Sequence, residues 1–103
     1  MIDRGRENER DPLVRPVDFP LGRMLMTPGV QAQVPPSEIV HALRRHAHGD
    51  WGELDNEDRQ ANDRALKEGT RLLSSYHTNA GVKFWIITEA DRSSTTVLLP
   101  EEY

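Results

Sequence analysis

Apolar runs alternate with turn-forming residues along the last third of the chain, which is the pattern of an antiparallel β-meander. The middle run is apolar on both faces, because Phe84 and Ile86 alternate with Trp85 and Ile87. Such a strand is typical of a sheet interior, so we expect it to be central and covered on both sides. The three expected strands span residues 71–78, 83–89 and 95–99.

An amphipathic helix is expected upstream of this meander. Ile39, Leu43 and Ala47 recur at a spacing of four residues, which places them on one face of a helix. The two prolines before Ser37 suit the first helical turn, and Gly49 is a typical residue for the end of the helix.

A second helix is expected over residues 56–68. Asp55 is a suitable N-cap residue, and Gly69 is expected to end the helix. Leu66 is the only large apolar side chain in this stretch, so we expect the helix to lie shallowly on the domain.

A short apolar run at residues 22–26, closed by a turn at residues 27–29, is interpreted as a further strand. Together these elements predict an α+β fold, with two helices packed on one face of a three- to four-stranded antiparallel sheet. The core is expected to contain Leu25, Ile39, Leu43, Leu66, Leu72, Phe84, Ile86, Val97 and Leu99.

Residues 1–18 are predicted to be a disordered charged tail, and residues 19–103 to be a single domain. Nine of the first 18 residues are charged, and Pro12 and Pro16 interrupt regular structure. Because the tail can bury little apolar surface, we expect its removal to change the melting temperature little.

The composition of the chain excludes several classes of site and structure. The chain has 103 residues, no cysteine and a formal net charge of −4, which excludes a disulfide framework and a thiolate metal site. No run approaches the roughly 20 apolar residues that cross a bilayer, and the N-terminus does not resemble a secretory signal. We therefore expect a cytoplasmic protein with no membrane, nucleic-acid or cofactor partner.

His46, His48 and Asp50 have the spacing that opens the metal site of some metallo-hydrolases. Those sites have a further histidine directly after the aspartate, where this chain has Trp51. Both histidines also fall at a predicted helix C-terminus, where a cation is favoured by the helix dipole. Helix capping and packing is therefore the preferred interpretation, and we expect no metal.

Four basic residues, His41, Arg44, Arg45 and His48, follow the spacing of one helix face. Residues 50–58 contain five acids and no base. The basic face either pairs with this acidic stretch within the molecule or binds nucleic acid or an acidic partner. No aromatic residues interleave the bases, which argues against a surface for single-stranded nucleic acid.

Two further features have alternative interpretations. Trp51, between the two helices, either fills the crevice between them or anchors a partner.

The turn at residues 88–93 brings together Glu89, Asp91 and Arg92, which could perform acid–base chemistry. Turn formation is the preferred interpretation, with Asp91 accepting backbone hydrogen bonds and Arg92 pairing with Glu89.

Several strings resemble a family of short bacterial proteins carried on plasmids and other mobile elements. They are His46–Leu54, then Asn62, Ala65–Leu66, Gly69 and Arg71–Ser74, and finally Phe84–Ser93, Thr95–Thr96 and Leu98–Pro100. The resemblance covers about residues 19–103. Members are usually labelled only plasmid-related or hypothetical, so it implies a bacterial cytoplasm and a mobile-element setting but supplies no catalytic residue.

We therefore expect a non-enzymatic protein-interaction module of a plasmid or other mobile element, with regulation or counter-defence as its setting. The apolar second face of the sheet also predicts a homodimer, with Trp85 or Trp51 near the contact. The candidate partner-binding residues are Asp50, Trp51, Trp85, Arg44, Arg45, Asp91 and Arg92.

The alternative is a small RelE/ParE-like ribonuclease toxin, which the order of the elements resembles. Toxins of that class use basic groups and a tyrosine around the sheet to handle a phosphodiester. The acidic balance of this chain departs from the class. The residues that would take these places are Arg71, Lys83, Arg92 and Tyr103.

Overall fold

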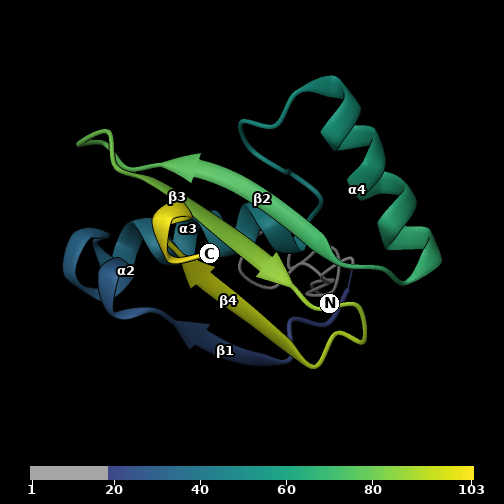
Figure 1. The fold of residues 1–103 in the computed structure, drawn as a ribbon, viewed down its shortest axis with the longest axis horizontal. Coiled ribbons are helices and arrows are strands. Elements are labelled where there is room, and N and C mark those ends of the chain that lie inside the picture. The colour runs from purple at the N-terminus through teal and green to yellow at the C-terminus, as the bar shows by residue number, and fades with distance from the viewer. Residues whose placement is uncertain (1–18) are drawn as a thin grey trace, which may run out of the picture.

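The computed structural model describes residues 19–103, so the tail predicted for residues 1–18 lies outside the described part (Figure 1). The expected α+β class is confirmed, with a four-stranded sheet and three α-helices in the described range. The elements are β1 (Arg23–Met26), α2 (Pro28–Gln33), α3 (Pro36–Ala47), α4 (Asn56–Glu68), β2 (Leu72–His77), β3 (Lys83–Thr88), β4 (Ser94–Leu98) and the 3-10 helix η1 (Pro100–Glu102).

The sheet is mixed rather than antiparallel. Its strand order is β1-β4-β3-β2, so the meander β2–β3–β4 is antiparallel and β3 is an interior strand, as predicted. The prediction of an antiparallel sheet is wrong for β1, which pairs in parallel with β4. No hairpin joins these two strands, so no turn in the sequence sets their relative direction.

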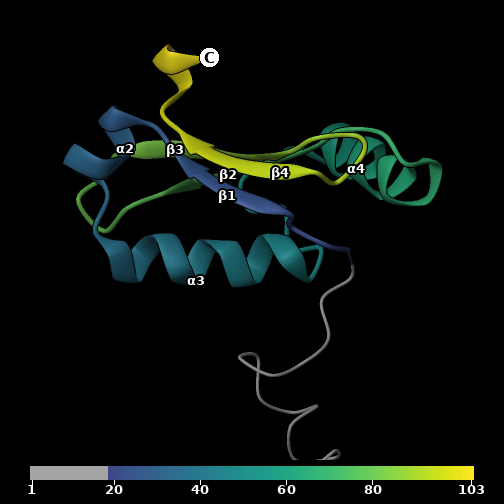
Figure 2. The ribbon, with the colours of Figure 1, turned by 90° about the horizontal axis from the view of Figure 1, so that it is seen from below.

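One face of the sheet packs against α3, which lies across it (Figure 2). Alternate residues of β2, β3 and β4 point to this face, where they meet Ile39 and Ala42 of the helix. This arrangement explains the spacing of apolar residues along α3. The buried cluster consists of Val30, Val34, Ile39, Ala42, Tyr76, Phe84, Ile86, Val97 and Leu99.

Helix α4 lies beside the outer edge of β2 rather than next to α3 (Figure 2). Its Asn62 side chain donates to the Leu73 carbonyl (2.5 Å) and accepts from the Leu73 N–H (3.2 Å). The side-chain amide of Asn62 thereby pairs with backbone groups of β2 that an edge strand otherwise leaves without a partner. A second buried cluster fills the space behind this contact, formed by Phe19, Trp51, Ala65 and Leu72.

Both ends of α4 follow the sequence prediction. The Asp55 carboxylate accepts from the Asp58 N–H (2.8 Å) as an N-cap, and Gly69 ends the helix in the left-handed conformation.

Helix α2 was not expected, because Thr27, Pro28 and Gly29 were interpreted as a turn. In the structure Thr27 is the N-cap, and its hydroxyl accepts from the Val30 N–H (3.3 Å). The Glu102 carboxylate accepts from the Thr27 hydroxyl (2.5 Å) and from the Gly29 N–H (3.0 Å). The C-terminal turn therefore stabilises the start of this short helix, which its own length could not do.

Most of the predicted core is confirmed. Leu43 and Leu66 are partly buried against the two clusters, whereas Leu25 is 39% exposed, so its prediction is wrong. Leu25 lies on an edge strand and points to the face opposite α3, where its side chain is incompletely covered. The predicted core residues that are buried are Ile39, Leu72, Phe84, Ile86, Val97 and Leu99.

Candidate functional site

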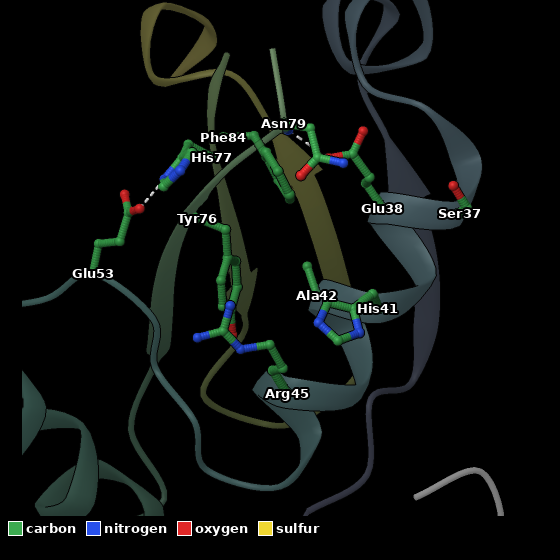
Figure 3. Close-up of a pocket in the computed structure, with 10 residues that line it drawn as sticks. All are labelled: Ser37, Glu38, His41, Ala42, Arg45, Glu53, Tyr76, His77, Asn79 and Phe84. Atoms are coloured by element: carbon green, nitrogen blue, oxygen red, sulfur yellow. Dashed lines mark hydrogen bonds and ion pairs between the residues drawn. The ribbon is translucent and has the colours of Figure 1, made fainter. Parts of the chain in front are cut away.

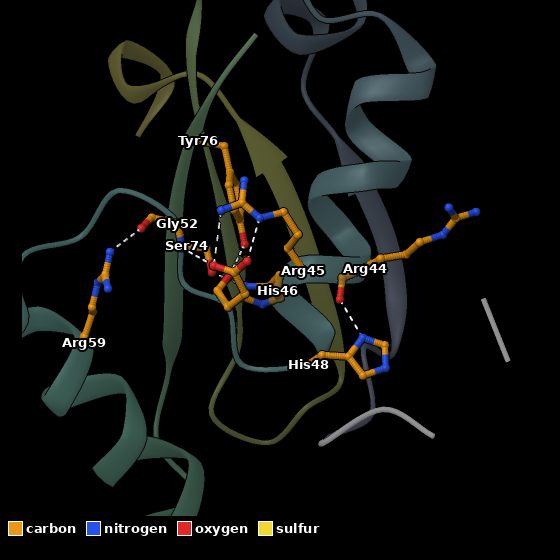
Figure 4. Close-up of polar contacts among 9 residues, drawn as sticks. Arg44, Arg45, His46, His48, Gly52, Arg59, Ser74 and Tyr76 are labelled. Carbon is orange, nitrogen blue, oxygen red and sulfur yellow. Dashed lines mark hydrogen bonds and ion pairs between the residues drawn. The ribbon is translucent and has the colours of Figure 1, made fainter. Parts of the chain in front are cut away.

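The end of α3 is tied to the acidic connector that follows it (Figure 4). Arg45 donates to both carboxylate oxygens of Asp50 at 2.7 and 3.2 Å, and its guanidinium lies 4.8 Å from the centre of the Tyr76 ring. The Asp50 hydrogen bond raises the pKa of Arg45, and the same bond lowers the pKa of the Asp50 carboxyl. For Arg45 and Asp50, the intramolecular interpretation of the basic face is therefore the one observed.

The basic face does not form one continuous surface. His48 Nδ1 lies 2.7 Å from the Arg44 carbonyl oxygen, while the Arg44 side chain extends away from the connector (Figure 4). Arg44 is thus exposed on the side of α3 away from Arg45.

The connector also contacts β2 closely. The Glu53 N–H donates to the Ser75 carbonyl (2.8 Å), and the Ser75 N–H donates to the Trp51 carbonyl (3.2 Å). Gly52, between these two bonds, has a φ of 76°, and a Cβ atom placed there would lie 2.0 Å from the Ser75 carbonyl oxygen. Only glycine fits this position.

We expect Gly52→Ala to lower the melting temperature clearly more than Gly81→Ala. Both glycines have a positive φ, so both substitutions incur the left-handed penalty of about 1–2 kcal/mol. No atom lies within 4 Å of a Cβ at Gly81, whereas Gly52→Ala must also move the connector off β2. Thermal unfolding followed by circular dichroism measures the difference, and equal losses would contradict the close contact.

His46 is fully buried, with both ring nitrogens in hydrogen bonds. Nδ1 lies 2.5 Å from Ser74 Oγ, and Nε2 lies 2.9 Å from Thr88 Oγ1. Thr88 Oγ1 in turn lies 2.7 Å from Thr95 Oγ1, which donates to the Leu21 carbonyl (2.7 Å). These residues form a polar relay from α3 across the sheet.

The relay determines which nitrogen of His46 carries the proton. Thr95 has one hydroxyl hydrogen, and it goes to a carbonyl, so Thr88 must donate to Thr95. Thr88 then accepts from His46 Nε2–H, which leaves Nδ1 as the acceptor of the Ser74 hydroxyl. Burial, together with a smaller effect of the nearby Arg92 guanidinium, lowers the pKa of His46 to about 3. His46 is therefore a neutral core residue at pH 7.

A polar pocket of about 430 Å³ lies between α3 and the ends of β2 and β3 (Figure 3). The Glu38 carboxylate accepts from the Asn79 N–H (2.7 Å), and Glu53 pairs with His77 at the opposite wall. His41 faces the space between them (Figure 3). Arg45 in this lining is already paired with Asp50, and two carboxylates also line the pocket, which disfavours a phosphate ligand.

Within residues 19–103, no three histidine, aspartate or glutamate side chains come together in a metal-binding arrangement. The ring nitrogens of His46 are engaged in the relay, and His48 binds a backbone carbonyl. The spacing that resembled a metallo-hydrolase motif is thus accounted for by packing and helix capping.

Trp51 lies inside the domain. Trp51 is 4% exposed, packs against the rings of Phe19 and His46, and donates from Nε1 to Asp63 Oδ1 (3.0 Å). This position agrees with the crevice-filling alternative for Trp51.

Arg92 is half-buried in its turn. With a φ of 60°, it donates to the backbone carbonyls of three residues at 2.6–3.2 Å. They are Thr70, Glu89 and Ala65.

The turn chemistry agrees with prediction in part. Asp91 accepts from the Ser93 N–H (3.0 Å), as expected. Arg92 contacts the carbonyl of Glu89 rather than its carboxylate, and that carboxylate lies 4.0 Å from Arg71.

The remaining candidates gather on the sheet face opposite α3. Arg71 donates to the Tyr103 hydroxyl (2.8 Å), and the Tyr103 ring lies 5.7 Å from the Trp85 ring. Lys83 is two residues from Trp85 on the same face of β3. Arg92 is separate from this group, since its guanidinium is bound to the carbonyls described above.

An apolar groove of about 460 Å³ runs between β1 and α3. Met24, Met26 and Val40 in its walls are 39%, 46% and 44% exposed, although they are large apolar side chains. Sequence reasoning missed this surface, and the signal that could have found it is Val40, an apolar residue outside the core-facing positions of α3. The groove is lined by Met24, Met26, Gln31, Val34, Pro36, Ile39, Val40 and Leu43.

Comparisons with family models, with curated proteins and with solved structures found no match to this chain. None of the helices in residues 19–103 has the length and apolar character needed to cross a membrane.

Proposed function

We propose that the protein is a non-enzymatic protein-interaction module that binds an apolar segment of another protein in the groove between β1 and α3. The observation that carries the proposal is the exposure of Met24, Met26 and Val40 around one groove. Grouped exposed apolar residues on a soluble domain are typical of binding surfaces. The sequence resemblance supports a mobile-element setting, within which we propose regulation or counter-defence as the role.

The proposal predicts that Val40→Glu abolishes partner binding while the domain stays folded. Val40 is 44% exposed, so a charge there disturbs the groove far more than the core. Proteins that copurify with the tagged full chain from a bacterial host are identified, and the purified partner is titrated against each variant. We expect affinity to fall at least about tenfold for Val40→Glu.

Ala61→Glu is the matched control, because Ala61 is exposed on α4, away from the groove. It should bind like the unmodified chain. A partner that binds Val40→Glu as tightly as Ala61→Glu would contradict the groove as the binding surface.

Homodimerisation through the second face of the sheet stays a prediction. Ile87 and Leu98 on that face are 2% and 5% exposed within the single chain, so a dimer contact would rest mainly on the half-buried Trp85. Light scattering at tens of micromolar measures the mass directly. A monomer whose mass and solubility are unchanged in Trp85→Ser would refute the dimer.

A ribonuclease toxin is the second candidate, favoured by the contact of Arg71 with Tyr103 beside Trp85. An arginine beside a tyrosine hydroxyl is a pair that can hold and protonate a phosphodiester. Induced expression in a host tests it: growth arrest relieved by Tyr103→Ala supports the ribonuclease, and harmless expression of the full chain opposes it.

A further inference from the structure

Resting on the proposed function, we infer that the partner binds as an extended strand added to the open edge of β1, with an acidic residue beside Arg44. β1 is an edge strand with β4 as its single neighbour in the sheet (Figure 1). The N–H of Arg23 donates to the Ser93 carbonyl just before β4 (2.9 Å), and the N–H of Thr27 donates to the Val97 carbonyl in β4 (3.1 Å).

In a parallel ladder, alternate residues direct their backbone groups to the same neighbour. Because Arg23 and Thr27 face β4, the N–H groups of Met24 and Met26 point to the open side. Within residues 19–103 the backbone N–H of neither methionine donates to a group outside the sheet. The edge thus presents the donors that a further strand would use.

The same two methionines direct their side chains into the groove. Met24 and Met26 are in register with Thr95 and Val97, which face α3, and both methionines line the groove together with Val40 and Leu43. Every second side chain of an added strand would therefore enter the groove beside them. Because the outward N–H groups and the apolar groove lie at the same edge, the favoured occupant is an extended strand in which apolar residues alternate.

The charge beside the groove indicates that the added strand carries an acidic residue. Arg44 is exposed one helical turn after Val40 on α3, and the groove lining contains no acid. In the described part of the chain Arg44 forms no ion pair. An acidic residue in the ligand would complement it. A second copy of this chain would instead bring another Arg44 to the interface, which makes it the less favourable occupant.

The test uses the full chain and a synthetic peptide in which valine alternates with threonine and two glutamates stand at one end. Isothermal titration calorimetry measures the dissociation constant for versions with the glutamates at either end. We expect N-methylation of alternate peptide amides to weaken binding at least about tenfold, because it blocks the backbone ladder. Replacing the glutamates by lysines should weaken it similarly, and added salt should reduce the difference.

Variants of the protein provide the second arm. Met24→Pro removes the outward N–H and is compatible with an edge strand, whereas Met24→Val keeps the N–H with an apolar side chain. We expect Met24→Pro to weaken peptide binding at least about tenfold, and Met24→Val less than about threefold. If Met24→Pro fails to fold, the affinity of the unmodified protein for the N-methylated peptide tests strand addition by itself.

Several outcomes would overturn the inference. Undetectable binding of the unmodified peptide, or equal affinity for its N-methylated form, refutes strand addition. A natural partner that still depends on Val40 would then leave the interaction module intact. Slow exchange of the Met24 amide hydrogen in the peptide-free full chain means that the edge is already occupied. A second copy is the occupant if that protection rises with protein concentration, and the chain's own N-terminal segment if it does not.

Discussion

Lowering the pH from 7 to 5 should reduce the free energy of unfolding by about 2 kcal/mol through His46 alone. The pKa of His46 is about 3 in the folded protein, compared with 6.5 for an unperturbed histidine. The unfolded chain therefore takes up a proton near pH 6.5, while folded His46 stays neutral. The contribution of neutral His46 to the free energy of unfolding is fully present above pH 6.5 and is lost progressively as the pH falls towards 3.

Burial and the nearby Arg92 guanidinium explain why folded His46 resists protonation. A proton on Nδ1 would face Ser74, whose hydroxyl hydrogen already points to that nitrogen. Ser74 would have to reorient in a site where it is fully buried. Protonation therefore reverses this hydrogen bond and places a charge in a buried site.

Urea unfolding at a series of pH values, followed by tryptophan fluorescence, measures this effect. His46→Gln is the control, because glutamine can donate to Thr88 but does not titrate. The variant should lose most of the pH dependence between 7 and 5, even if its stability at pH 7 is lower. An equally steep loss in His46→Gln would show that other groups cause it.

Replacing Trp51 by alanine should lower the free energy of unfolding by about 3–5 kcal/mol. Trp51 is 4% exposed and lies between the rings of Phe19 and His46, so its removal leaves a cavity in the second cluster. It also removes the indole donor to Asp63. This loss is a large part of the stability of a small domain.

Trp85→Ala is the matched control, since the chain has two tryptophans and Trp85 is half-buried beside Tyr103. Its cost should be less than half of that for Trp51→Ala. If Trp51→Ala does not fold, Trp51→Phe should still fold and show a smaller loss of stability. Equal costs for the two alanine substitutions would contradict the burial of Trp51.

Local sequence patterns determined the elements whose partners are close along the chain. The meander is readable because short turns bring β2, β3 and β4 together in order, and the alternation in Phe84–Ile87 shows that β3 is covered on both faces. The ends of α4 are readable because Asp55 and Gly69 act on backbone groups within a few residues. These features depend on spacing alone.

Tertiary structure decided everything that joins distant residues. The direction of β1 follows from its pairing with β4, about 70 positions away, and α2 is stabilised by Glu102 from the C-terminal turn. The role of His46 as a neutral relay residue depends on hydroxyl groups from three strands. The groove exists because an exposed edge strand lies beside Val40 of α3. Each of these contacts joins segments far apart in the sequence, so no local periodicity records it.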